Sequence, residues 1–153
     1  MKSVQLSFVC TRIVIALTVL SAVWTATPLG RHRLTASLGY AERAGAENAQ
    51  TPLIMGLYYA CCIPALVALL CLDRLLGNIK KERVFVEENV KALRTISWCC
   101  FAEALLFAAA ALYYAHILLV PAIAMAFFGL ILRVVKNVID AAVSLKTEND
   151  FTI

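Results

Sequence analysis

The chain of 153 residues is too apolar for a water-soluble domain. Hydrophobic residues make up 62% of it and charged residues 16%, whereas soluble domains carry about 25% charge. This composition excludes a disordered chain, a collagen-like fibre, a coiled-coil rod and a small disulfide-stapled secreted domain. The net charge of +4 requires no nucleic-acid partner, because basic residues beside apolar segments also contact anionic lipid. We therefore expect a membrane protein that does not bind nucleic acid directly.

Four apolar stretches have the length of membrane-spanning helices, about 20 residues, and none shows the alternation of a strand. They cover residues 4–26, 53–72, 95–115 and 117–135. The predicted fold class is therefore all-α, a polytopic four-helix bundle that forms one domain over residues 1–153. The first stretch has one alternative, a cleaved signal peptide. Trp24 favours a retained helix, because it stands where a cleavage site needs small residues.

The positions of the fourteen Lys and Arg residues predict the orientation of the bundle. Only Arg31, Arg33 and Arg43 lie between the first two spans, and none lies between the last two. The other basic residues lie near the amino end, in the link 73–94 and around the tail 136–153. Cytoplasmic segments of membrane proteins are enriched in Lys and Arg. Both termini are therefore predicted to lie in the cytoplasm.

Residues 28–52 form the predicted external loop. Pro28 and Pro52 are expected to stop the helices on either side of it, because proline interrupts helical hydrogen bonding. The loop is longer than a turn, so two interpretations stay open. It is either a flexible connector, or it carries a short helix or recognition surface over the mouth of the bundle.

The cytoplasmic segments predict two further helical features. In the link, Val86, Val90 and Leu93 share one face, and Glu87 favours a first turn, so a short amphipathic helix is expected there. Apolar residues also repeat at helical spacing through residues 131–145, which predicts that the fourth helix continues into the cytoplasm. This extension can pack on the link helix, either only to seal the bundle or to support a partner.

Polar and charged residues of these segments form the candidate interaction surface. It consists of Asn89, Arg94, Arg133, Asn137, Glu148, Asn149 and Asp150.

Two stretches resemble a known family. They run from Gly77 to Trp98 and from Arg133 to Ile153, in that order and at the ends of predicted spans. They are similar to small bacterial four-span inner-membrane proteins catalogued as domain of unknown function 2975. The resemblance, which covers the chain from about Leu53 onward, implies this fold, a bacterial inner-membrane location and frequent association with small helix-turn-helix regulators. It implies no activity and no catalytic residues.

Glu103 is the acidic residue deepest in any predicted span. An ionised carboxylate is costly there and usually faces the interior of a bundle. Intramembrane carboxylates also serve proton-coupled export in small four-span multidrug transporters. Two interpretations stay open: a structural Glu103 that pairs with Tyr58, Tyr59 or a Ser or Thr hydroxyl, and a Glu103 that couples transport of an ion or substrate.

The six cysteines and two histidines do not predict an enzyme. Adjacent cysteines occur at 61–62 and 99–100, but the Cys-x-x-Cys spacing common in thiol oxidoreductases does not, and cysteine also packs as a small apolar residue. His32 and His116 lie toward the external face without a third ligand. We predict no metal, no cofactor and no catalytic residue.

The sequence thus favours a non-catalytic interaction or regulatory protein that acts through its cytoplasmic link and tail. The alternatives are a small transporter or channel subunit that uses Glu103 and, with least support, a membrane thiol-redox enzyme. The expected partners are the lipid bilayer, a cytoplasmic protein and, in a homo-oligomer, further copies of the chain.

Overall fold

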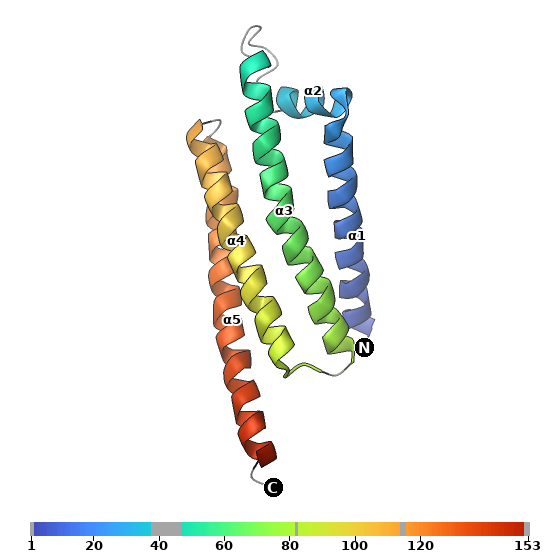
Figure 1. Cartoon of the computed structure of the whole chain (residues 1–153), viewed down its shortest axis with the longest axis vertical. Coiled ribbons are helices and arrows are strands. Elements are labelled where there is room, and N and C mark those ends of the chain that lie inside the picture. Colours follow the sequence, from blue (N-terminus) through green and yellow to red (C-terminus); the bar gives the residue numbers. More distant parts are fainter. Residues whose placement is uncertain (1, 38–46, 82, 114–115, 152–153) are drawn as a thin grey trace.

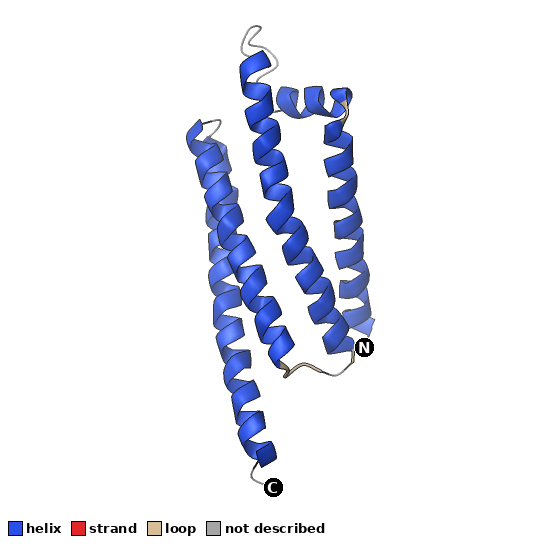
Figure 2. Ribbon diagram, viewed as in Figure 1, coloured by secondary structure: helices blue, strands red, loops and turns tan. Residues whose placement is uncertain are grey.

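The computed structural model of the protein describes residues 2–37, 47–81, 83–113 and 116–151, which contain helices and no strand. Four long helices lie roughly side by side, and both termini lie at one end of the molecule (Figure 1). They are α1 (Lys2–Ala26), α3 (Glu47–Lys80), α4 (Glu87–Tyr113) and α5 (Leu119–Phe151). A short helix, α2 (Pro28–Ser37), and a 3-10 turn, η1 (His116–Leu118), complete the helical structure (Figure 2).

Each of the four long helices is long and apolar enough to span a membrane. Large apolar side chains are exposed along them, including Leu20 on α1, which is 64% exposed, and Ile123 on α5, which is 63% exposed. So much exposed apolar surface suits lipid rather than water. The predicted all-α architecture with four spans is confirmed.

The long helices pack in chain order. Helix α1 contacts α3, α3 contacts α4, and α4 contacts α5, whereas no contact among the described residues joins α1 to α4 or α5. Figure 1 shows α1 and α5 on opposite sides of the molecule. Helix α1 therefore does not touch the α4–α5 pair, and the gap in helix contact leaves space for a cavity.

Helices α4 and α5 form the most extensive pair. Gly129 allows their close approach, because a Cβ atom at this position would lie 3.3 Å from the ring of Phe101. The buried hydroxyl of Ser97 donates a hydrogen bond of 2.9 Å to the carbonyl oxygen of Gly129. The close packing of α5 against α4 fixes the position of α4 and of its side chains.

A sharp corner joins α1 to α2, at the end opposite to the termini (Figure 1). Pro28 is the first residue of α2, where its missing N–H costs nothing. Thr27 caps the helix, since its hydroxyl accepts a hydrogen bond of 3.1 Å from the amide of Gly30. The predicted external loop therefore contains a short helix, as one of the two interpretations expected, while its residues 38–46 lie outside the described part of the chain.

The prediction that Pro52 stops a helix is wrong. Helix α3 begins at Glu47 and contains both Pro52 and Pro64. Proline near the start of a helix removes only one backbone hydrogen bond, which the helix tolerates.

The link between α3 and α4 is shorter than predicted. Helix α3 continues past Leu72 to Lys80, and the predicted amphipathic segment forms the first turns of α4 instead of a separate helix. Neither glycine nor proline interrupts this segment, and its apolar residues Val90 and Leu93 are buried. Helix α5 continues to Phe151, as the predicted extension of the last span requires.

Candidate functional site

Glu103 lies near the middle of α4 and is 7% exposed. Ten residues of helix, about 15 Å, separate it from Tyr113 at the end of α4. Because the hydrocarbon core of a bilayer is about 30 Å thick, a helix that spans it carries Glu103 close to the midplane. The prediction that this carboxyl group points away from lipid agrees with its burial.

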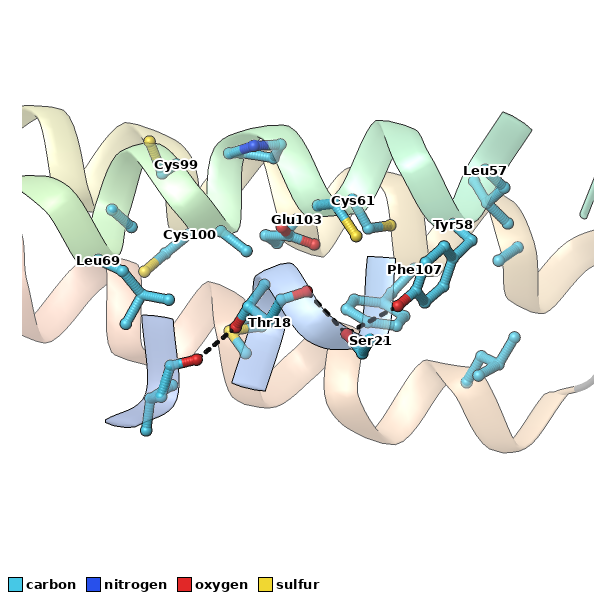
Figure 3. Close-up of a pocket in the computed structure, with 18 of the residues that line it drawn as sticks. Thr18, Ser21, Leu57, Tyr58, Cys61, Leu69, Cys99, Cys100, Glu103 and Phe107 are labelled. Carbon is cyan, nitrogen blue, oxygen red and sulfur yellow. Dashed lines mark hydrogen bonds between the residues drawn. The ribbon is translucent and has the colours of Figure 1, made fainter. Parts of the chain in front are cut away.

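Glu103 lines a cavity of about 680 Å³ between the helices (Figure 3). Every helix contributes to the lining, Leu34 from α2 and Met125 from α5 included, so the cavity occupies the space that α1 leaves open toward α4 and α5. The lining is almost entirely apolar. Its more polar side chains are Thr18, Ser21, Tyr58, Cys61, Cys62, Cys99, Cys100 and Glu103.

The carboxyl group of Glu103 is incompletely satisfied. The thiol of Cys61 and the backbone of Ala65, both on α3, approach it, and Figure 3 shows Cys61 beside Glu103. Its buried atom Oε1 nevertheless has no hydrogen-bond partner among the described residues. Buried polar atoms in folded proteins are nearly always paired, so an unpaired carboxyl oxygen marks a position where a ligand or water can bind.

The hydroxyl groups predicted to pair with Glu103 bond elsewhere. The Tyr58 hydroxyl donates to the Ser21 hydroxyl at 3.0 Å, and the Tyr59 hydroxyl donates to the carbonyl oxygen of Ala22 at 3.3 Å. The Thr18 hydroxyl donates within α1. The two tyrosine bonds hold α1 against α3, and none of the three bonds engages the carboxyl group of Glu103.

The cysteines that line the cavity are not joined in disulfides and form no metal site with other described residues. All six cysteines are free thiols. The described residues contain no group of three or more His, Cys, Asp or Glu side chains suited to a metal ion. The sequence indicated Cys61 only as one of two adjacent cysteines. Its contact with Glu103 depends on the packing of α3 against α4 and became visible only in the structure.

The structure divides the residues of the predicted interaction surface. Asn89 is 2% exposed, so its assignment to a surface is wrong. Arg94, Arg133 and Asn137 line one pocket of about 320 Å³ at the end where the termini lie, together with Ser97, Trp98 and Lys136. Glu148 and Asn149 are exposed near the end of α5, apart from that pocket, while the side chain of Asp150 lies outside the described residues.

Asn89 instead holds the α3–α4 link together. Its side-chain amide donates hydrogen bonds of 2.8 Å to the carbonyl oxygens of Arg83 and Val84, and its oxygen accepts one of 2.9 Å from Asn78. These bonds satisfy backbone groups that no helix satisfies. Asn89 therefore has a structural role that explains its burial.

The chain matches the family model described as "Protein of unknown function (DUF2975)" over residues 30–153, which include α3, α4 and α5 but not α1. No curated protein and no solved structure matches the chain.

Proposed function

The chain belongs to the DUF2975 family of proteins of unknown function, and we propose that it binds a small amphipathic cation inside the membrane. The observation that carries this proposal is the unpaired carboxyl oxygen of Glu103 in the cavity between the helices. The proposed role is binding, as a receptor or as part of a transport cycle, and not catalysis.

The size and chemistry of the cavity support such a ligand. A volume of about 680 Å³ falls within the range of small-molecule sites, which are mostly apolar with a few placed polar groups. A carboxylate inside the hydrocarbon is costly unless an opposite charge accompanies it. An organic cation supplies that charge while its apolar groups contact Phe107 and other lining residues.

Two ions of the same shape and opposite charge test the proposal. We expect purified protein in neutral-lipid nanodiscs to bind tetraphenylphosphonium but not tetraphenylborate. The amount of each ion taken up by empty nanodiscs is measured separately and subtracted. Glu103→Gln keeps the shape of the side chain and removes its charge, so it should weaken tetraphenylphosphonium binding about tenfold or more, because the buried cation loses its ion-pair partner.

Glu87→Gln is the matched control, because Glu87 is exposed and lies outside the cavity. It should bind like the parent protein. Equal binding of the two ions, or unchanged binding by Glu103→Gln, would contradict the proposal.

The location of the protein is a further part of the proposal. We propose that the end of the bundle with both termini, here named the basic end, faces the cytoplasm of a bacterial inner membrane. The concentration of Lys and Arg at this end supports the orientation.

A second candidate function is regulation through a soluble partner at the basic end. It is supported by the length of α5, whose 33 residues extend about 50 Å, well beyond the thickness of a hydrocarbon core. Figure 1 shows its carboxyl end projecting past the other helices. A protein that co-purifies with the full chain but not with a chain ending at Leu145 would support this function, and equal recovery with both would count against it.

A further inference from the structure

A second site lies at the basic end, between α4 and α5. Arg94 and Trp98 on α4 and Arg133 and Lys136 on α5 line the pocket of about 320 Å³ described above. Each helix contributes residues at spacings of three and four, so they share one face. The antiparallel packing of α4 and α5 brings the two faces together, and the result is a pocket with three cationic side chains.

The positive charge of this pocket is only partly neutralised. Lys136 pairs with Asp140 at 3.1 Å, whereas neither Arg94 nor Arg133 has an ion-pair partner among the described residues. Glu87, Asp140 and Glu148 share a neighbouring groove with Arg94, and the first two are already paired with lysines. Two guanidinium groups on one pocket repel each other, and an anion bound between them removes that repulsion.

Trp98 restricts the position of one of these guanidinium groups. The guanidinium carbon of Arg133 lies 5.3 Å from the centre of the Trp98 ring, which is a cation–π contact. Lys136 is also restrained, since its side chain is only 14% exposed and its amino group contacts Asn137 at 3.1 Å. Side chains that are already ordered lose less entropy when they bind a ligand.

The depth of the pocket matches the headgroup region of a bilayer. Nine residues of α4, about 14 Å, separate Arg94 from Glu103. If Glu103 lies at the midplane, Arg94 lies at the edge of the hydrocarbon core, whose half-thickness is about 15 Å. Trp98 lies one helical turn, about 6 Å, on the hydrocarbon side of Arg94. Lipid phosphate groups lie just outside this edge, in the headgroup layer that the charged end of a long arginine side chain can reach.

We propose that Arg94, Arg133 and Lys136 form a binding site for the phosphate group of an anionic phospholipid. Arginine binds phosphate through two parallel hydrogen bonds, and basic pockets between membrane helices are suited to anionic headgroups. The lipid bridges α4 and α5 at the basic end. This site is separate from the cavity at Glu103 and does not depend on the proposed cation.

Lipid binding by single-residue variants tests this proposal. Detergent-solubilised full-length protein is titrated with phosphatidylglycerol or phosphatidylcholine of identical acyl chains, and bound lipid is counted by native mass spectrometry. We expect phosphatidylglycerol to be preferred, and Arg94→Gln and Arg133→Gln each to weaken its binding about tenfold, as loss of a charge-assisted hydrogen bond predicts. Arg74→Gln removes an exposed positive charge of α3 outside this pocket and should leave binding unchanged.

Two further measurements make the result specific. Arg133→Lys keeps the charge but loses the planar group over Trp98, so its affinity for phosphatidylglycerol should lie between those of the parent protein and Arg133→Gln. The lysine variant also replaces Arg133→Gln in the test if the glutamine variant does not fold. Equal binding of phosphatidylglycerol and phosphatidylcholine would overturn the site. A loss of phosphatidylglycerol binding in Arg74→Gln equal to that in the two pocket variants would also overturn it. Glycerol phosphate bound as tightly as the whole lipid would overturn its assignment to lipid.

Discussion

At the scale of single residues, Asn89 supplies a stability prediction. Asn89→Ala removes the hydrogen bond from Asn78 and leaves the carbonyl oxygens of Arg83 and Val84 without their partner in a partly buried place. We expect it to lower the free energy of unfolding by about 2 kcal/mol, because buried groups without hydrogen bonds are costly. Thermal unfolding in one detergent, followed by circular dichroism, measures the change. Asn149→Ala is the control, since Asn149 is exposed; equal melting temperatures would contradict the structural role.

Glu103 and Asn89 differ in how far the sequence predicts their burial. The burial of Glu103 was predictable, because an acidic residue in the middle of an apolar run has few acceptable environments. The position of Asn89 was not, since asparagine near a charged helix start is usually exposed. Its partners are carbonyl groups of residues 83–84, whose irregular backbone no helical periodicity describes.

At the scale of helices, the corner between α1 and α2 depends on Gly30. A Cβ atom at this position would collide with the backbone of Trp24 and Thr25 in α1. Gly30→Ala must therefore push α2 away from α1, and we expect a loss of about 1–3 kcal/mol in stability, as overpacking costs. The matched variant is Gly56→Ala on α3, where a Cβ atom meets nothing within 4 Å. A Gly30→Ala protein that melts no lower than Gly56→Ala would show that the corner tolerates the extra atom.

The helices were more predictable than their ends. The first two predicted spans lie within α1 and α3, and most of the other two lies within α4 and α5, because apolar length and helical hydrogen bonding are both required in lipid. The ends differ since α3 and α4 continue beyond the apolar runs, where helix-forming residues such as Arg74, Lys91 and Arg94 replace apolar ones without breaking the backbone pattern. Hydropathy marks where a helix leaves lipid, not where it stops.

At the scale of the whole molecule, the open packing of the helices determines where ligands can bind. Helix α1 is held to α3 by Tyr58, Tyr59 and an exposed pair of Arg12 with Asp73 at 3.4 Å, and the described residues give it no contact with α4 or α5. The four spans were predictable from hydropathy, but this order of packing was not, because every span is apolar on most sides. The cavity at Glu103 follows from the packing and therefore became visible only in the structure.

The distribution of charge predicts which end of the molecule faces the cytoplasm. Both termini lie at the basic end with all but three of the fourteen Lys and Arg residues, so the cost of moving charge across the membrane favours keeping this end inside. In bacterial cells, green fluorescent protein fused after Ile153 should fluoresce, and alkaline phosphatase fused there should be inactive. Phosphatase inserted between α2 and α3 should be active. Active phosphatase after Ile153 would reverse the orientation, and the lipid site at Arg94 would then face the outer leaflet.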